Sequence, residues 1–373
     1  MIHTNLLRSN HKRRSFWQAI HIDPPLLFGI FLLIVAGLGI LYSSSGRSFS
    51  MIEQQALHIG LALVVMMAFA QIPPIVYQRW AVWLYSIGVV LLVAVLLVGH
   101  VGKGAERWLN LGFMRFQPSE LMKLAIPLFL ASELHKIHLP LTAKSIFFAI
   151  VIIVIPTALT IKQPDLGTGI LLMLAGCSIL FLAGLSYRLI MLSIAVALPF
   201  IPAIWYLMHD YQRQRILIFL DPERQPLGAG YHIIQSKIAI GSGGFFGKGW
   251  LNGTQSHLHF LPEHSTDFIF AVCGEELGFI GNLFLITLFM MIVLRGLYIT
   301  INAQDTFSRL LAGGLTLTFF FSFFINMGMV TGILPVVGLP LPLVSYGGSS
   351  MVTLMASFGI LMSIQTHRKL LTT

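Results

Sequence analysis

The sequence predicts an all-α integral membrane protein with ten transmembrane helices and a long outer loop between the seventh and eighth. Of its 373 residues, 56% are hydrophobic and only 10% are charged, which leaves too little polar material to build a water-facing surface. Apolar runs of about 17–25 residues recur along the chain, and each is long enough to cross a hydrocarbon core. The runs are continuous rather than alternating, which argues against a transmembrane β-barrel.

The apolar runs indicate a single polytopic domain over residues 1–373. The seventh span contains Pro199 and Pro202, which we expect to kink it. An even number of spans puts both termini on one side, and the basic residues near both chain ends place that side in the cytoplasm. We expect the spans at residues 26–43, 54–71, 80–98, 118–132, 144–161, 166–184, 187–208, 267–294, 309–332 and 349–366.

Three polar segments fall on the predicted outer face, at residues 99–123, 162–168 and 209–266. With this topology the outer face concentrates charges of both signs, as a site for a charged substrate would. Residues 333–350, with the sequence ILPVVGLPLPLVSYGGSS, are apolar and rich in Pro and Gly. Irregular backbone at membrane depth is tolerated where it lines a cavity, so we expect this segment to form a re-entrant cap over a cavity.

Acidic residues gather where the long outer loop enters the eighth span. Glu263 and Asp267 lead into an apolar run that contains Glu275 and Glu276, and ionisable groups at membrane depth are costly enough to suggest function. A carboxylate becomes an effective base when partial burial raises its pKa, so Asp267 is the candidate catalytic group. In the alternative, Asp267 lies in the first helical turn, after a Ser or Thr N-cap, and complements the helix dipole.

Four long segments carry a family resemblance. They are QPDLGT at 163–168, DPERQPLGAGYHIIQSKIAIGSGG at 221–244, STDFIFAVCGEELG at 265–278 and GMVTGILPVVGLPLPLVSYGGSS at 328–350. With these segments the chain resembles the SEDS family (shape, elongation, division and sporulation) over nearly all ten spans. HDYQRQRI, at 209–216, and the short N-terminal head resemble the elongation member more than the division member.

The resemblance implies a peptidoglycan glycosyltransferase that polymerises lipid II at the periplasmic face of the bacterial cytoplasmic (inner) membrane for cell elongation. It implies a class B penicillin-binding protein as transpeptidase partner, together with other elongation-complex proteins, and no nucleic acid. It also implies that Asp267 is the essential acid and that Trp108, Glu120 and Lys123 occupy important positions.

Several further residues are candidates for binding the substrate. Glu120 and Lys123 are three residues apart and can pair on one helix face. That pair is either structural or holds Lys123 against the pyrophosphate of lipid II. Arg107 could clamp phosphate oxygens, and Trp108 could stack on a sugar or prenyl group or simply anchor the chain at the interface. We add Asp165, in the break between spans five and six, as a substrate-binding candidate.

The long loop contributes two more substrate-binding candidates, Arg213 and Arg215. The histidines in the same loop match no metal motif. A divalent cation, Mg²⁺ or Mn²⁺, shared between Asp267, another carboxylate and the pyrophosphate is the candidate cofactor, but the metal ligands stay unknown. We expect Glu275 or Glu276 to pair with an Arg or Lys from a neighbouring helix.

Three functions compete for this sequence. The first is an inverting transfer in which Asp267 deprotonates the acceptor sugar and undecaprenyl pyrophosphate leaves. The second is a lipid II flippase without covalent chemistry, which would need polar groups reachable from both leaflets. The third is a scaffold, for which outer-face carboxylates would be dispensable. The gathering of carboxylates at the outer face favours the transferase.

Overall fold

A computed structural model describes residues 20–98, 100–102, 105–110, 115–137, 141–200, 202, 205–206, 208, 210–224, 229–257, 260 and 263–367 of the chain. This part of the chain is mostly helical, with three short strands. Its α-helices are α2 (Pro24–Ser44), α3 (Phe49–Gln71), α4 (Pro74–Val98), α5 (Pro118–Leu134), α6 (Ala143–Lys162), α7 (Leu166–Leu182), α8 (Tyr187–Ala197), α10 (Asp210–Leu220), α11 (Ala229–Gly243), α12 (Thr254–His257), α13 (Ile269–Ile301), α14 (Thr306–Val330) and α15 (Ser349–Thr366).

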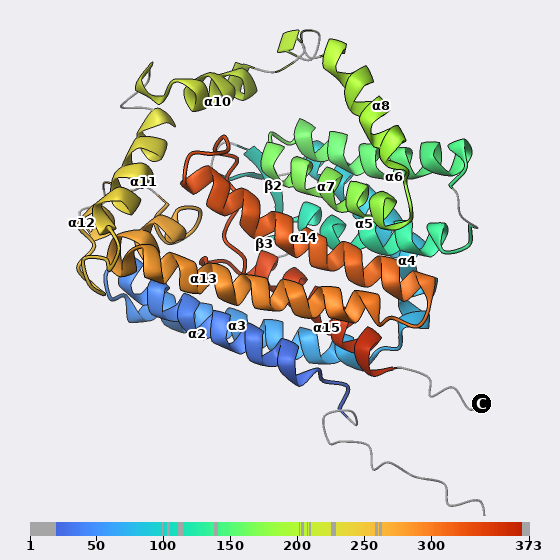
Figure 1. The fold of residues 1–373 in the computed structure, drawn as a ribbon, viewed down its shortest axis with the longest axis horizontal. Coiled ribbons are helices and arrows are strands. Elements are labelled where there is room, and N and C mark those ends of the chain that lie inside the picture. Colours follow the sequence, from blue (N-terminus) through green and yellow to red (C-terminus); the bar gives the residue numbers. More distant parts are fainter. Residues whose placement is uncertain are drawn as a thin grey trace, which may run out of the picture.

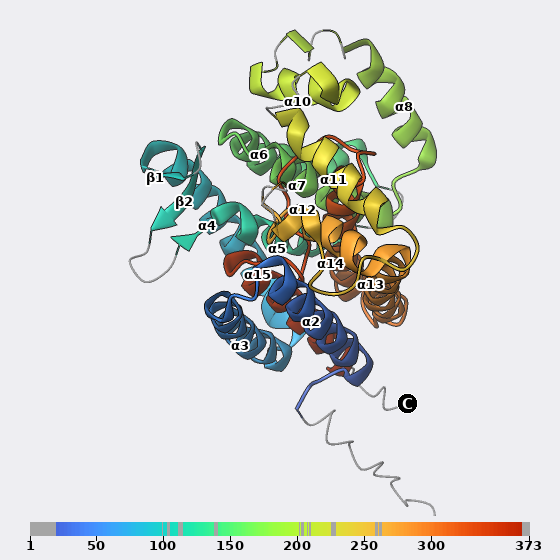
Figure 2. The same cartoon turned by 90° about the vertical axis from the view of Figure 1, so that its left-hand side faces the viewer.

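The long helices form a bundle around α14 (Figure 1). Helix α14 packs against α13, α7 and α5, and most of its residues are buried. On one side of the bundle, α2 packs against α13 and α3 packs against α15, and on the other side α4 to α7 pack together. Helices α8, α10 and α11 arch over the bundle, as Figure 2 also shows. The core is therefore made of apolar helix faces that pack against one another.

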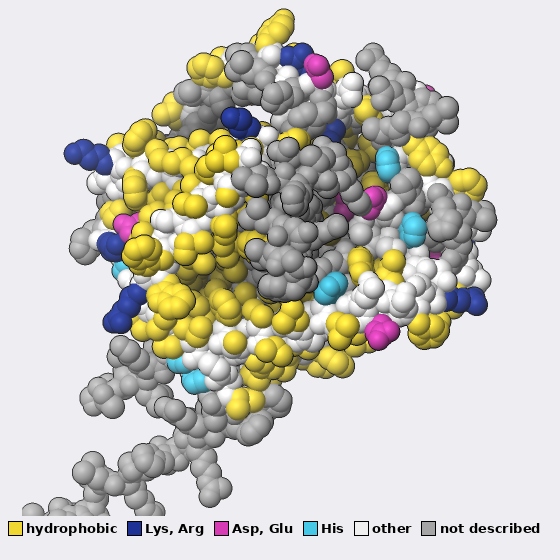
Figure 3. All heavy atoms as spheres, turned by 180° about the vertical axis from the view of Figure 1, so that it is seen from behind, with side chains coloured by type: hydrophobic (Ala, Val, Ile, Leu, Met, Phe, Trp, Pro, Cys, Tyr) yellow, Lys and Arg dark blue, Asp and Glu magenta, His cyan; other side chains and the backbone are white. Residues whose placement is uncertain are grey.

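Within the described residues, seven helices are long and apolar enough to cross a membrane: α2, α3, α4, α6, α13, α14 and α15. Their outward sides are rich in hydrophobic residues. Figure 3 shows such side chains over a broad area of one face, with Lys and Arg mainly at its margins. The predicted class of helical membrane protein is confirmed at this level. Helices α5 and α7 have 17 residues each and α8 has 11, so the count of ten spans stays a prediction.

Two details differ from the sequence prediction. The predicted seventh span is not one continuous helix. Helix α8 ends at Ala197 and passes into a 3₁₀ turn, Leu198–Phe200, because the residue before a proline disfavours the helical conformation. Helical residues occur again at Pro202, Trp205 and Tyr206. The outer segment after α4 forms an antiparallel sheet of β1 (His100–Gly102), β2 (Ala105–Asn110) and β3 (Arg115–Phe116), so the chain is not purely α-helical.

The predicted irregular segment before the last helix is confirmed. Residues 333–348 contain neither helix nor strand. Several of their apolar side chains are buried, among them Leu339, Leu341 and Leu343. Burial in protein is what permits irregular backbone at this depth.

At the opposite end of the bundle, the first and last described segments are tied together. The rings of His21 and His367 stack with centroids 3.8 Å apart. Beside them, the Arg295 guanidinium makes two hydrogen bonds to the Asp23 carboxylate, of 2.6 and 2.9 Å. The chain therefore enters and leaves the described bundle at the same end, and Arg295 is a structural ion-pair partner.

Helix α13 is interrupted at Gly278, where a loop inserts into it. Gly278 has φ 69° and ψ −161°, and the backbone N–H groups of Phe279 and Ile280 donate to the carbonyls of Gly244 and Phe245. A Cβ atom at Gly278 would lie 2.3 Å from the Gly247 nitrogen. The loop that follows α11 is thus anchored backbone to backbone in α13.

Replacing Gly278 with alanine should therefore destabilise the protein. Such a backbone conformation is nearly exclusive to glycine, and together with the clash we expect a cost of about 2–4 kcal/mol. Thermal unfolding of the purified variant measures it. The matched control is Gly60→Ala in α3, where an added Cβ would meet nothing within 4 Å. Equal unfolding temperatures for the two variants would contradict this account.

Candidate active site

A polar cavity of about 400 Å³ opens where several helices begin. We call it the outer cavity. Its wall comes from four separate parts of the chain: the start of α5, the start of α7, the turn before α13 and the irregular segment before α15, with α10 at its side. It is lined by Gln117, Glu120, Asp165, Thr168, Arg215, Glu263, Thr266, Asp267, Val337, Gly338, Leu339, Pro340, Tyr346, Gly347, Gly348, Ser349 and Ser350.

The N-terminal ends of α5, α7, α13 and α15 all lie at or next to the outer cavity. Helix N-termini carry unpaired N–H groups and partial positive charge, which favours anions. The same wall carries four carboxylates, from Glu120, Asp165, Glu263 and Asp267. The cavity thus places acids beside groups that can hold a negatively charged ligand.

Asp267 lies in the turn of residues 263–268, just before α13. Helix α13 begins at Ile269, with Phe268 as its N-cap and no side-chain cap bond. Asp267 is therefore not in the first helical turn, contrary to the alternative weighed from the sequence. Its Oδ2 lies 3.5 Å from the position that a Cβ atom at Gly338 would occupy, so the carboxylate lies close to the irregular segment.

The backbone around Asp267 is bonded to the irregular segment. The Ser345 hydroxyl donates to the Thr266 carbonyl at 2.5 Å, and the Tyr346 N–H donates to the Ser265 carbonyl at 2.9 Å. The Asn326 amide, from α14, donates to the carbonyl of Asp267 itself at 2.8 Å. Our reading of the sequence missed these contributors. A lone asparagine in an apolar run was the only signal for Asn326.

Asp165 has a structural role at the cavity wall. It is the N-cap of α7, and its Oδ1 accepts a hydrogen bond from the Thr168 N–H at 3.2 Å. Its Oδ2 accepts a hydrogen bond from the Gln117 side chain at 2.9 Å. These bonds tie the starts of α5 and α7 together, so Asp165 shapes the cavity whether or not it touches substrate.

Glu120 and Lys123 form the predicted pair on α5, with Nζ and Oε1 2.7 Å apart. Both side chains are largely buried, with 7% of Glu120 and 15% of Lys123 exposed. Glu120 lines the outer cavity, whereas Lys123 lines a smaller neighbouring pocket of about 50 Å³ that shares Glu120 with it. Glu120 therefore lies between the Lys123 ammonium group and the outer cavity.

The two arginines predicted in the long loop differ in position. Arg215 lines the outer cavity and donates to the Val336 carbonyl at 3.2 Å. Arg213 is not among the lining residues, and its guanidinium donates to the carbonyls of Trp205 and Tyr206 at 2.8 and 2.6 Å. Arg213 holds the start of α10 to the preceding segment, and its contact with substrate stays a prediction.

Arg107 and Trp108 lie on β2, but their side chains are outside the described part of the chain. Backbone pairing places Trp108 opposite His100 in the sheet. Their roles as phosphate clamp and stacking platform therefore stay predictions.

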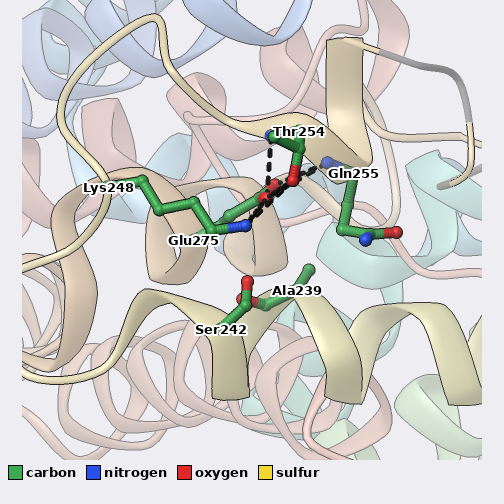
Figure 4. Close-up of polar contacts among 6 residues, drawn as sticks. All are labelled: Ala239, Ser242, Lys248, Thr254, Gln255 and Glu275. Carbon is green, nitrogen blue, oxygen red and sulfur yellow. Dashed lines mark hydrogen bonds and ion pairs between the residues drawn. The ribbon is translucent and has the colours of Figure 1, made fainter.

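Glu275 is held by residues of the long loop and of the short helix α12 within it (Figure 4). Its fully buried carboxylate accepts hydrogen bonds from Lys248 Nζ at 2.7 Å, from the Thr254 hydroxyl at 2.9 Å and from the N–H groups of Thr254 and Gln255. Glu276 accepts a hydrogen bond from the Ser43 hydroxyl at 2.6 Å. The expected structural pairing holds for Glu275, but its basic partner is a loop residue.

His232 on α11 stacks against Phe268, next to Asp267, with ring centroids 5.8 Å apart. Burial lowers the pKa of His232 below its ordinary value, and the nearby Glu263 carboxylate opposes this by raising it. Its Nδ1 is buried and has no hydrogen-bond partner among the described residues. Burial therefore favours the neutral ring.

This predicts a loss of stability in mild acid. As pH falls through the ordinary histidine pKa, near 6.5, His232 binds a proton in the unfolded chain but not yet in the folded chain. The free energy of unfolding therefore decreases. We expect the unfolding temperature to drop between about pH 7.5 and pH 5.5, and to drop less in His232→Gln. Thermal unfolding at both pH values tests this, and an equal drop in the variant would refute it.

Metal ligands do not gather in the described part of the chain. No group of three or more His, Cys, Asp or Glu side chains lies close enough there to hold an ion. The carboxylates of the outer cavity therefore do not by themselves form a site for Mg²⁺ or Mn²⁺, which need several oxygen ligands.

The fold and the cavity define a polytopic helical membrane protein with an acidic site at one end of its bundle. Residues 19–370 match the model of the FtsW/RodA/SpoVE family of cell cycle proteins. The chain belongs to this family, which is the SEDS family that the sequence resembles.

Similar proteins and solved structures agree with this family assignment. The chain is 54% identical to the peptidoglycan glycosyltransferase MrdB of Escherichia coli K12, covering 98% of this chain and 99% of that protein. It is 38% identical to a probable peptidoglycan glycosyltransferase FtsW of Trichlorobacter lovleyi, covering 96% of each.

Two solved structures share the fold. One is a chain of a peptidoglycan synthase complex that coordinates polymerization and crosslinking, with 31% identity and a TM-score of 0.82, covering 93% of this chain and 99% of that one. The other is the rod shape determining protein RodA of Thermus thermophilus, with 26% identity and a TM-score of 0.70, covering 93% and 98%.

Proposed function

We propose that this chain is a peptidoglycan glycosyltransferase that polymerises lipid II into glycan strands for cell elongation. Family membership and full-length similarity to MrdB support this activity. The observation that carries it is the convergence of Glu120, Asp165, Arg215 and Asp267, from four separate segments, on one cavity.

In the proposed reaction, Asp267 is the general base. Its carboxylate takes the proton from the hydroxyl of an acceptor N-acetylglucosamine, and the resulting oxygen attacks the anomeric carbon of N-acetylmuramic acid in the donor. The bond from that carbon to undecaprenyl pyrophosphate breaks, and the pyrophosphate leaves with the electron pair. Direct displacement inverts the centre and gives a β-1,4 bond. A positioned base contributes about 10²–10⁴-fold to such a step.

The departing pyrophosphate needs positive charge. Arg215 lines the outer cavity, and a guanidinium matches phosphate oxygens in two places. The helix N-termini add oriented N–H donors, and Lys123 lies just behind Glu120. No step of the proposal uses a metal ion.

The proposed orientation puts the outer cavity at the periplasmic face of the cytoplasmic membrane. All lining segments belong to the predicted outer side, whereas the His21–His367 stack joins the first and last described segments at the predicted cytoplasmic side. We propose ten spans with both termini in the cytoplasm, α8 supplying the seventh. The partner is a class B penicillin-binding protein, in keeping with the similarity to a chain of a synthase complex.

The test combines the purified full-length chain, lipid II and the partner transpeptidase. We expect glycan strands and free undecaprenyl pyrophosphate. The alternative function, a lipid II flippase, predicts lipid movement across vesicle membranes and no polymer. Transport without polymer under conditions in which a known glycosyltransferase is active would overturn the proposal.

A further inference from the structure

One buried side chain connects the two walls of the outer cavity. Asn326 lies on α14 and is fully buried. Its Nδ2 donates to the Asp267 carbonyl at 2.8 Å and to the Leu339 carbonyl at 2.6 Å. Both neighbours are acceptors, so the NH₂ end of the amide must face them and the amide cannot be flipped.

The Asn326 side chain connects the two walls next to the Asp267 carboxylate. Leu339 directly follows Gly338, and Gly338 is the residue that the Asp267 Oδ2 faces at 3.5 Å from an ideal Cβ. The turn at 263–268 and the segment at 333–348 are both irregular, so no helix or strand ladder sets their separation. The hydrogen bonds of Ser345 and Tyr346 join the two walls farther along the segment. Asn326 fixes their spacing beside the acid.

An asparagine at this position has a cost. The Asn326 Oδ1 is buried without a partner among the described residues, and an unsatisfied buried acceptor costs about 1–3 kcal/mol. Leucine has a similar volume and would remove this acceptor, but it would leave the carbonyls of Asp267 and Leu339 without the amide donor. The amide keeps its two donors at the cost of an unpaired oxygen, and both donors serve the cavity walls.

We propose that Asn326 is a positioning residue that holds Asp267 at the distance the glycosyl transfer requires. It touches the backbone of Asp267 and not the reacting atoms. This inference rests on the proposed function. A displacement of about 1 Å at a reacting centre can cost about 10²-fold in rate, whereas substrate binding, spread over the whole cavity, should change little.

The experiment uses Asn326→Leu, which keeps the volume and removes both donors, and Asn326→Asp, which keeps the shape. The full-length chain is assayed with its transpeptidase partner and lipid II. We expect kcat to fall about 10²-fold in Asn326→Leu while KM for lipid II changes less than about threefold. Asn326→Asp should fall at least tenfold, because an ionised carboxylate would face two carbonyl oxygens and a protonated one could donate only one hydrogen bond.

Asn282→Leu is the matched control. Asn282 is also a buried amide with an unpartnered Oδ1, but it lies in α13 away from the cavity, and its variant should stay within about twofold of wild type. Thermal unfolding is recorded for all variants.

Wild-type kcat in either Asn326 variant would overturn the inference, as would activity losses that only follow unfolding temperature across the Asn326 and Asn282 variants. Absence of polymer from the wild-type chain would instead overturn the proposed function.

Discussion

Asp267→Asn should reduce polymerisation by about 10³-fold, because the amide cannot accept the proton of the acceptor hydroxyl. The side chain keeps its size, so the cavity and the Asn326 bond to the Asp267 carbonyl should persist. Binding of lipid II should stay close to wild type, and unfolding temperature should not fall. Polymer formation by the purified chain with its partner and lipid II measures the loss.

The matched control is Asp210→Asn. Asp210 is another acid of the predicted outer side, but its side chain is 94% exposed and lies 3.7 Å from Arg213. A weak exposed ion pair contributes about 0–1 kcal/mol, so this variant should polymerise at nearly the wild-type rate. Wild-type activity in Asp267→Asn would remove the base assignment, and equal losses in both variants would point to a general charge effect.

Lys123→Met should be the most destabilising single substitution at the site. It leaves the Glu120 carboxylate, only 7% exposed, without its cation, and breaking a buried pair in this way costs about 3–5 kcal/mol. In the double variant Glu120→Gln, Lys123→Met, no unpaired charge remains, so stability should largely return. Thermal unfolding of the two single variants and the double variant measures the coupling.

The same set separates the two readings of this pair. A purely structural pair predicts that the double variant regains activity together with stability. We expect stability to return and polymerisation to stay at least tenfold lower, because the charge next to the pyrophosphate is gone. Glu133, at the end of α5, and Lys136, in the turn after it, provide the control pair, with the same spacing and the same 2.7 Å separation but 27% and 55% exposure. Lys136→Met should cost no more than about 1 kcal/mol.

Much of the fold could be predicted because the membrane restricts what a chain can do. Backbone polar groups in hydrocarbon must be satisfied within a helix, so the apolar runs became α2, α3, α4, α6, α13, α14 and α15 with ends shifted by a few residues. The prediction failed where tertiary contacts decide. The predicted seventh span is broken by a 3₁₀ turn at Pro199, and Glu275 pairs with a lysine from a loop.

Some features of the candidate site could likewise be predicted from the sequence, and others could not. Asp267, Glu120 and Lys123 could be singled out because ionisable groups near apolar runs are costly, and their pairing followed from helical spacing. The separation of Arg215 from Arg213, only two residues apart, was not accessible from the sequence. Both are basic residues in one loop, and only the path of α10 places Arg215 in the cavity and Arg213 against Trp205 and Tyr206.

The sequence by itself determined that this protein is a bundle of membrane helices, and it marked acids and a Pro- and Gly-rich segment as special. Those properties depend on the composition and the hydrophobic periodicity of residues that are close together in the sequence. Only the tertiary structure decided that Asp267 faces Gly338 and that Asn326 spans the gap between their segments. The segments are some 70 residues apart in the chain. Their approach depends on how α14, which hydrogen-bonds to both through Asn326, packs against them, and no local pattern records that packing.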